Sequence, residues 1–303
     1  MKAQPRLIGM SELSIDCALV AEELRKAIRE RTIALNRSGA VFALDGGIDS
    51  AVVALLACEA VGAGRVGALI MSDSFVGQSV DRAVQFAQRL GLRYKVVDVG
   101  QSLVRLGIGD SLPRLLAPFR RLRSYFLGRL KDRTAKAHWS QLVGLGSVQD
   151  ESLRRAIAVE RAKARQRMVV LYYYAEMGNM LVLGSCNKTD EMVGICVKYG
   201  DSACDFAPLR SIYKTQIKQL ADYLGLRKMF ADVTDYSATS SWLGAELVTD
   251  LPYEMLDRVL LRIERGLDSV AIATYLGLEP ERVELIRNLV QKSNAPERPW
   301  KRD

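Results

Sequence analysis

The sequence predicts an α/β fold, a doubly wound parallel sheet with helices on both faces. Short apolar runs of strand length alternate with longer amphipathic runs of helix length over residues 12–100, and the pattern resumes over residues 151–224. The strand-length runs are apolar at nearly every position, which is typical of parallel strands buried on both sides. In this class of fold the ligand lies at the carboxyl ends of the strands, so we expect the functional site at that edge.

The individual elements follow from hydrophobic periodicity and from glycines that end helices, such as Gly91 and Gly225. The predicted strands cover residues 41–44, 66–71, 94–99 and 180–184, and the predicted helices cover residues 12–37, 51–57, 81–90, 151–177 and 211–224, with further helices ending near Gln291. The loop at residues 72–78 leaves the second strand at the ligand edge. It could hold adenine or ribose through Gln78, or it could be a plain connector.

Residues 41–57 organise the chain as a strand, a glycine turn and a helix. Gly46 and Gly47 let the backbone approach a ligand, and the N–H groups at a helix start favour an anion. Asp49 offers a carboxylate for a metal, and Ser50 offers a hydroxyl for a phosphate oxygen. The alternative is an ordinary turn in which Asp49 or Ser50 caps the helix. The spacing lacks both the P-loop lysine and the third glycine of the dinucleotide fingerprint.

The composition predicts a soluble protein, and we expect a single domain over residues 1–303. Hydrophobic residues make up 49% of the chain and charged residues 26%, which is enough for a sizeable core. No apolar run approaches membrane-spanning length and the amino terminus lacks a signal-peptide layout, so we expect no membrane partner. Five cysteines form no CxxC pair and His138 is the only histidine, so we expect a cytoplasmic protein without a zinc site.

The net charge of +8 predicts an anionic partner, which a nucleotide satisfies as well as nucleic acid does. Much of this charge lies in a basic insertion near residues 100–150, which has no clean helical or strand period. We favour a solvated or disordered insertion over two alternatives, a flap above a phosphorylated substrate and an RNA-binding face. Because the insertion holds few aromatic residues on which bases could stack, we expect no nucleic-acid partner.

Five blocks of sequence give the chain a specific resemblance. Asp45-Gly-Gly-Ile-Asp-Ser50 resembles the pyrophosphate loop of the N-type ATP pyrophosphatases, which usually reads Ser-Gly-Gly-x-Asp-Ser. Four further blocks resemble those of the ammonia-dependent NAD synthetase family, and they occur in the family's order: Arg165-Gln-Arg-Met168, Leu183-Gly-Ser-Cys-Asn-Lys-Thr-Asp190, Lys198-Tyr-Gly-Asp-x-x-x-Asp205 and Tyr213-Lys-Thr-Gln216. The resemblance covers roughly residues 12–100 and 155–290.

The resemblance implies an adenine nucleotide alpha hydrolase-like fold and a homodimer. It also implies a ligase that adenylates the nicotinate carboxylate of deamido-NAD with Mg-ATP, releases pyrophosphate and lets ammonia displace AMP. A carboxylate is a poor acyl donor, and AMP gives it a leaving group, while oxygen ligands suit the Mg²⁺ that neutralises the pyrophosphate. The expected cofactors are therefore ATP and Mg²⁺, and the expected partners are ammonia and a small-molecule carboxylate, either deamido-NAD or an analogue.

The family's site residues carry over onto matching positions. Asp49 and Asp190 stand where the family places two metal carboxylates. Asp190 replaces a longer Glu, so it could reach the metal through water, or Glu191 could serve instead. The candidates for nucleotide and substrate binding are Asp45, Gly46, Gly47, Asp49, Ser50, Gln78, Arg165, Ser185, Asp205 and Ser237.

The resemblance also implies three catalytic residues. Lys198 and Lys214 match positions that face phosphate and the tetrahedral intermediate, where a cation stabilises growing negative charge. Asp201 matches a residue that takes a proton from ammonium or from the attacking amine. Taken one at a time, each could be a helix cap or an ion-pair partner, but their clustering after one strand favours a site.

The departures from the family pattern concern the substrate half and one loop residue. The substrate loop at residues 236–246 keeps only Ser237, Ala238 and one acidic residue of the family's pattern. Agreement returns at Tyr253-x-x-Leu-Asp257, at the start of a helical carboxyl-terminal part near residues 250–292. Asp45 replaces the leading Ser of the pyrophosphate loop, and a carboxylate facing the phosphates would repel them by roughly 4 kcal/mol at ~4 Å.

Three hypotheses therefore remain open. The first is an amide-forming ligase, the second a catalytically degenerate relative that binds nucleotide, and the third a thiolating or RNA-modifying ATP pyrophosphatase. Asp45 and the altered substrate loop motivate the second, and Cys186 and the basic insertion motivate the third. Asp45 itself could bind a second metal, turn away to cap the helix, or weaken ATP chemistry.

Overall fold

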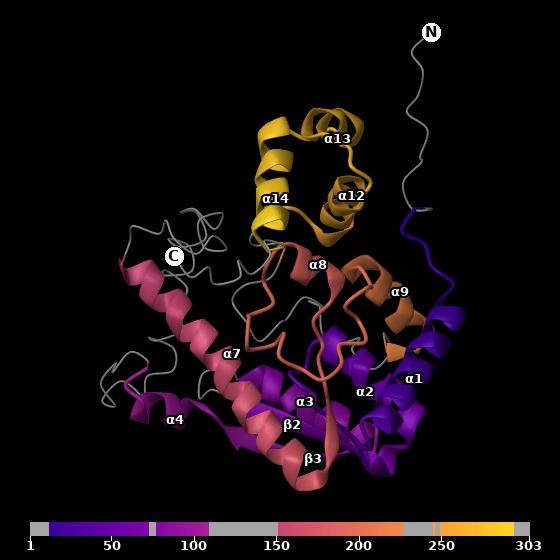
Figure 1. Cartoon of the computed structure of the whole chain (residues 1–303), viewed down its shortest axis with the longest axis vertical. Helices are drawn as coiled ribbons and strands as arrows, with labels where there is room; N and C mark the ends of the chain where they lie inside the picture. Colours follow the sequence, from indigo (N-terminus) through magenta and orange to yellow (C-terminus); the bar gives the residue numbers. More distant parts are fainter. Residues whose placement is uncertain (1–11, 73–76, 109–150, 227–244, 246–248, 294–303) are drawn as a thin grey trace, which may run out of the picture.

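The computed structural model describes residues 12–72, 77–108, 151–226, 245 and 249–293 (Figure 1). Its described part contains one parallel sheet, in which the strands lie in the order β3-β2-β1-β4. The strands are β1 (Gly39–Ala43), β2 (Val66–Ser72), β3 (Arg93–Asp98) and β4 (Met180–Leu183). The helices are α1 (Cys17–Ala34), α2 (Ile48–Val61), the 3-10 turn η1 (Ala63–Arg65), α3 (Gly77–Arg89), α4 (Gly100–Arg105), α7 (Glu151–Gly178), α8 (Lys188–Met192), α9 (Lys214–Tyr223), α12 (Tyr253–Glu264), α13 (Ser269–Leu276) and α14 (Pro280–Ser293).

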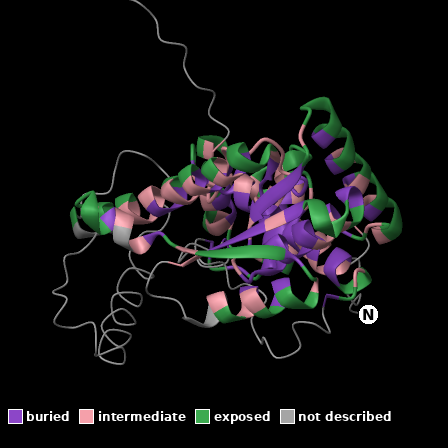
Figure 2. Ribbon diagram, turned by 90° about the horizontal axis from the view of Figure 1, so that it is seen from below, coloured by how far each residue is buried: buried purple, intermediate pink, exposed green. Residues whose placement is uncertain are grey.

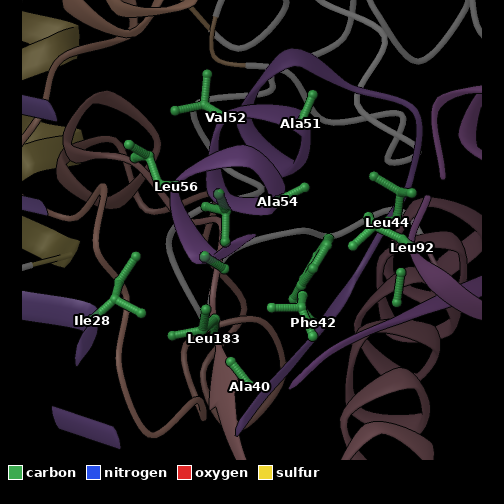
Figure 3. Packing of buried hydrophobic residues seen from close by; sticks show 14 of the residues in the cluster. Ile28, Ala40, Phe42, Leu44, Ala51, Val52, Ala54, Leu56, Leu92 and Leu183 are labelled. Atoms are coloured by element: carbon green, nitrogen blue, oxygen red, sulfur yellow. The ribbon is translucent and has the colours of Figure 1, made fainter. Parts of the chain in front are cut away.

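Helices cover both faces of this sheet, which confirms the predicted α/β class. Alternate strand residues point to opposite faces. On one face Phe42 and Leu183 pack in a cluster that also draws on α1, α2, α3 and α9, and Figure 3 shows part of that packing against α2. On the other face Val41 and Val182 pack against α7 through residues such as Leu171. The central strands are therefore buried on both sides, whereas the edge strand β3 is mostly exposed (Figure 2).

The order of the strands fixes where the site lies. From β1 the chain passes through α2 to β2 on one side, and it later returns to β4 on the other side of β1. The loops that follow β1 and β4 therefore diverge from neighbouring strand ends at a topological switch point, where ligands bind in folds of this kind. The two loops carry Asp45–Ser50 and Ser185–Asp190, the segments that the sequence analysis singled out.

A second helical layer lies beyond the carboxyl ends of the strands. Helices α12, α13 and α14 form a cluster with its own apolar core, which includes Leu256, Ile272 and Ile286. The short helix α8 lies between this cluster and the sheet, next to α9 (Figure 1). The carboxyl-terminal helices thus cover the side of the molecule on which the switch point opens.

The strands agree with the sequence prediction to within two residues, but several helix starts do not. Helix α1 begins at Cys17 rather than at residue 12, because the Asp16 carboxylate caps it by accepting from the N–H groups of Ala18 and Leu19 at 3.0 and 3.1 Å. Helix α3 begins at Gly77, so Gln78 lies in its first turn rather than in a connecting loop.

Most of the predicted basic insertion lies outside the described residues. No helix among the described residues combines the length and the apolar character that crossing a bilayer needs.

Candidate active site

The loop after β1 has the geometry of an anion cradle. The N–H of Leu44 donates to the carbonyl of Leu69 at 2.9 Å, so strand pairing continues one residue past β1. Gly46 then has φ of 80°, a left-handed conformation that favours glycine, and Gly47 forms the N-cap of α2. Asp49 and Ser50 follow in the first turn of α2, and both are buried. The unsatisfied N–H groups of a helix start therefore lie at the switch point.

Asp45 turns its carboxylate into this loop. Its Oδ1 accepts from the N–H of Gly47 at 2.9 Å and from the hydroxyl of Ser50. Ser50 Oγ also lies 3.1 Å from the carbonyl of Gly47. Asp45 therefore does not turn away to cap α2, whose N-cap residue is Gly47, but bridges the loop between Gly47 and Ser50. The same contacts occupy the hydroxyl that was expected to serve a phosphate oxygen.

Three elements bring a buried charge cluster together at the switch point. Lys214, the first residue of α9, donates through Nζ to Asp49 Oδ2. The amide Nδ2 of Asn187 donates to Asp190 Oδ2 at 2.7 Å and lies 3.5 Å from Asp49 Oδ1, so it spans both carboxylates. Asn187 Oδ1 also accepts from the N–H of Asp190 at 2.9 Å and thereby caps α8. Asp49, Asp190 and Lys214, predicted from three separate blocks, thus lie together.

The charges in this cluster are unequally matched. Burial raises the pKa of Asp190 to about 7, although the Lys214 ammonium acts in the opposite direction. Burial alone would lower the pKa of Lys214, but the carboxylates of Asp49 and Asp190 outweigh it and raise that pKa. Asp190 Oδ1 is buried without a hydrogen-bond partner. When both carboxylates are ionised, one ammonium leaves a negative charge unmatched, which a further cation could match.

Lys198 and Asp201 follow on the segment between α8 and α9. The carbonyl of Lys198 accepts from Arg165 Nε at 3.2 Å, and Lys198 Nζ lies 4.9 Å from the centroid of the Tyr199 ring. Asp201 lies 3.8 Å from a guanidinium nitrogen of Arg167. Partial burial raises the pKa of Asp201, the Arg167 charge opposes this, and the Asp45 carboxylate adds to it. The Arg165 side chain thus contacts the backbone of this segment. The negative charge in the loop after β1 acts on the pKa of Asp201.

Asp205 is engaged in contacts that hold the fold together. Its Oδ1 accepts from the hydroxyl of Tyr172 at 2.9 Å, and its Oδ2 accepts from the N–H of Val182 at 2.9 Å. These bonds join α7 to β4. Ser185 is half-buried at the start of the loop after β4. Ser237 lies outside the described residues, and for Gln78 the structure describes only the backbone.

The sequence analysis missed several partners of the cluster. Asn187 lies inside a quoted block, and its position three residues before Asp190 is a recognisable helix cap that would have indicated it. Thr189 contacts Asp257 across 68 residues of sequence, and no local pattern predicts such a pair. A disulfide joins Cys186 to Cys196, although the spacing of the cysteines had suggested no framework.

Comparisons with known proteins identify the family. A sequence profile of the NAD synthase family matches residues 20–107 and 132–299. The NH(3)-dependent NAD(+) synthetases of Thermotoga maritima and Methanocaldococcus jannaschii are each 30% identical to this chain; the matches cover 90% of this chain and 94% and 92% of the relatives. The structure of the NH3-dependent NAD synthetase from Campylobacter jejuni has a TM-score of 0.62 and 25% identity, covering 94% of this chain and 99% of that one. The chain belongs to the NAD synthase family and is an enzyme of the carbon–nitrogen ligase class.

Proposed function

We propose that this protein amidates the nicotinate carboxylate of deamido-NAD with ammonia, using Mg-ATP and releasing AMP and pyrophosphate. The observation that carries the proposal is the meeting of Asp49, Asp190 and Lys214 beside the glycine turn of α2. A helix start, a buried ammonium and two carboxylates at a switch point are what a bound triphosphate and its metal require.

The donor set fits Mg²⁺. Among the described residues, no group of three or more histidine, cysteine and acidic side chains could hold a metal ion by itself. Mg²⁺ commonly binds one or two carboxylates together with substrate phosphates and water, and the pair Asp49 and Asp190 matches that pattern. The buried oxygen of Asp190 that lacks a partner supports this assignment. When bound, Mg²⁺ would neutralise the charge that develops on pyrophosphate.

The adenylation step follows from this arrangement. An oxygen of the substrate carboxylate attacks the α-phosphorus of ATP, and the bond between that phosphorus and the bridging oxygen to the β-phosphate breaks. The N–H groups at the start of α2 and the ammonium of Lys214 would stabilise the negative charge that grows on the phosphates. Because the carboxylates of Asp49 and Asp190 raise the pKa of Lys214 in spite of its burial, it stays protonated at neutral pH and carries that charge throughout.

The amidation step needs a base. Ammonia attacks the acyl carbon of the adenylate, the bond between that carbon and the AMP oxygen breaks, and the nitrogen must lose a proton. We assign this proton transfer to Asp201, which lies on the segment that also carries Lys198. Its raised pKa makes it a better base than an ordinary aspartate, and the Arg167 guanidinium, 3.8 Å away, opposes that rise.

Two structural observations bear on the alternatives. The contacts of Asp45 with Gly47 and Ser50 occupy donors of the anion cradle, which favours weakened nucleotide chemistry as the second candidate function. The disulfide between Cys186 and Cys196 leaves no free thiol at position 186, which disfavours a sulfur-transfer role for that residue.

Assembly and location complete the proposal. We propose a homodimer, in keeping with the exposed apolar residues Val169, Tyr173 and Met177, which recur every fourth residue along α7. Sedimentation at micromolar concentration tests this. A single domain over residues 1–303 and a cytoplasmic location stay predictions.

The deciding experiment combines the protein, Mg-ATP and ammonia with a panel of carboxylates that includes deamido-NAD. Chromatography of the mixture should show AMP, pyrophosphate and NAD, with deamido-NAD as the best acceptor. ADP as the main nucleotide product would contradict the proposed chemistry. AMP release with a different carboxylate would move the assignment to another substrate, and no product with any carboxylate would favour the degenerate relative.

A further inference from the structure

Asp257 lies on α12, outside the proposed active site, and its carboxylate contacts two elements that build that site. Its side chain is fully buried. Oδ1 accepts from the hydroxyl of Thr189 on α8 at 2.6 Å. Oδ2 accepts from both the N–H and the hydroxyl of Thr215 on α9, at 2.8 and 2.7 Å. The carboxylate therefore joins three helices at one point.

Thr189 extends this network to the two charged residues of the site. It immediately precedes Asp190 in α8, and its Oγ1, besides donating to Asp257, accepts from the N–H of Lys214 at 2.9 Å. Lys214 and Thr215 are the first two residues of α9, and their N–H groups have no acceptor within the helix. Thr189 and Asp257 supply the missing acceptors, and a negative charge at a helix start is favourable.

We propose that Asp257 is a positioning residue, which fixes α8 and the first turn of α9 against each other and thereby sets Asp190 opposite Lys214. It touches neither nucleotide nor carboxylate substrate in this assignment. It acts through Thr189 and Thr215, whose neighbours in sequence are the two site residues.

The surroundings leave little room for compensation. Lys214 is 1% exposed, its Nζ contacts Asp49, and the centroid of the buried Tyr253 ring lies 5.4 Å from that nitrogen. Tyr253 belongs to the same helix α12 as Asp257. In a close-packed interior a shift of α9 by a fraction of an ångström cannot be absorbed by a change of side-chain rotamer. Loss of the Asp257 carboxylate contacts would thus change the position of the Lys214 ammonium.

The test compares substitutions that remove this link with one that disturbs α12 elsewhere. Thr189→Val keeps the shape of Thr189 but removes its hydroxyl, while Thr189→Ser keeps the hydroxyl. Asp257→Ala removes the carboxylate itself, and Thr189→Val keeps the test decisive where Asp257→Ala does not fold. Glu12→Gln is the matched control, because Glu12 Oε2 accepts from the guanidinium of Arg262, a buried residue of α12, at 2.9 Å.

The readout is kcat per folded molecule, with the folded fraction measured separately, together with the KM for Mg-ATP. Because misplacement of about 1 Å can cost about a hundredfold in rate, we expect kcat to fall by about tenfold or more in Thr189→Val and Asp257→Ala, with a smaller change in KM. Thr189→Ser and Glu12→Gln should stay within about twofold of the wild type, even if Glu12→Gln lowers the thermal midpoint. A purely structural Asp257 would instead lower the midpoint and leave kcat per folded molecule unchanged, which overturns the inference.

The inference rests on the proposed function only for this kinetic readout. Measurements on the wild type distinguish a failure of the inference from a failure of the proposed function. Wild-type turnover supports the proposed function whatever the variants do. If the wild type has no turnover, calorimetry with Mg-ATP replaces the kcat measurement. Thr189→Val should then weaken Mg-ATP binding by about fivefold or more, while Glu12→Gln does not. Equal affinity in wild type and Thr189→Val contradicts the inference, and so does a wild type that neither binds Mg-ATP nor turns over.

Discussion

The carboxylate of Asp45 accepts a hydrogen bond from the hydroxyl of Ser50, five residues further along the chain. The same oxygen accepts from the N–H of Gly47 at 2.9 Å. The Asp45 carboxylate thus occupies two hydrogen-bond donors of this loop. The glycine turn and the helix start of the same loop suit a phosphate. Nucleotide binding at this loop must either displace the carboxylate or find other donors.

The first prediction concerns Asp45→Ser, which releases both donors and removes the repulsive charge. We expect the affinity for Mg-ATP to rise by about tenfold, or about 1.4 kcal/mol, in calorimetry. The protein itself should become less stable, because a hydrogen bond to a charged group contributes about 1.5–3 kcal/mol.

Asp45→Asn is the matched control for this substitution. It keeps an oxygen that can accept from Gly47 and Ser50 but removes the charge, so its affinity should lie between those of the wild type and Asp45→Ser. A loss of affinity in Asp45→Ser would mean that Asp45 is a working ligand. Unchanged affinity would mean that the carboxylate does not compete with phosphate at all.

The second prediction concerns the buried pair of Asp49 and Lys214. Asp49→Ala leaves the Lys214 ammonium 1% exposed with a partner removed, and breaking a buried pair in this way costs about 3–5 kcal/mol. Because Asp190 still raises the pKa of Lys214, we expect a loss near the lower end of that range in urea unfolding. The double variant Asp49→Ala with Lys214→Met should lose less than the sum of the two single variants, since it removes both charges.

Additive losses in this double-mutant cycle would show that the two charges do not depend on each other. Mg-ATP binding distinguishes the structural role of Asp49 from its proposed metal role. Asp49→Ala should weaken the Mg-dependent affinity by about tenfold or more. Unchanged affinity would leave Asp49 as an ion-pair partner only.

The sequence predicted the sheet well because buried parallel strands are recognised from composition alone. The apolar run at residues 180–184 is recognised as a strand without any alternation of polar and apolar residues. In the structure β4 covers Met180–Leu183. The predicted helix starts were less accurate, because a helix start depends on which side chain folds back onto the N–H groups of the first turn. Asp16 caps α1, and α9 starts at Lys214, three residues after the predicted start at 211, where Gln216 Oε1 accepts from the N–H of Tyr213 at 3.0 Å.

The candidate site was predicted only as far as its motifs reach. The resemblance placed Asp49, Asp190 and Lys214 in one site, and the structure brings them together. The direction of the Asp45 carboxylate could not be predicted, because metal binding, helix capping and weakened ATP chemistry were all compatible with the same residue. The contact between Thr189 and Asp257 depends on how α12 packs on α8, which lies beyond any local pattern.

The third prediction concerns the disulfide between Cys186 and Cys196, which closes a short loop around α8. From loop-closure entropy, this crosslink should stabilise the folded chain by about 2–3 kcal/mol. We expect Cys186→Ser to lower the free energy of unfolding by that amount without reductant and to match the wild type in dithiothreitol.

Titration of thiols after unfolding in urea, without reductant, provides the check on this pair, because burial makes the Cys58 thiol unreactive in the folded chain. The free thiols of the oxidised protein are those of Cys17, Cys58 and Cys204. Reduction should therefore raise the count from three to five, the total in the sequence. Five reactive thiols in freshly purified protein without reductant would mean that the pair stays open under those conditions.

The last prediction concerns Cys58, which lies on α2 away from the site and packs against the main core. Burial raises the pKa of its thiol to about 11 from 9.0, and the neighbouring Glu59 carboxylate acts in the same direction. Below pH 9 the thiol is protonated in both the folded and unfolded chains. Between pH 9 and 11 the unfolded chain loses this proton first, so the free energy of unfolding falls as the pH rises.

Cys58→Ala removes this titration and leaves the others in place. We therefore expect the stability difference between wild type and Cys58→Ala to shift in favour of the variant as the pH rises from 9 to 11, in urea unfolding with reductant present throughout. Below pH 9 the difference should be independent of pH, since neither state ionises there. Thiolate absorbance of the folded protein gives an independent check, because one thiol that appears only near pH 11 must vanish in the variant. A pH-independent difference over the whole range would show that the thiol ionises equally readily in the folded and unfolded chains.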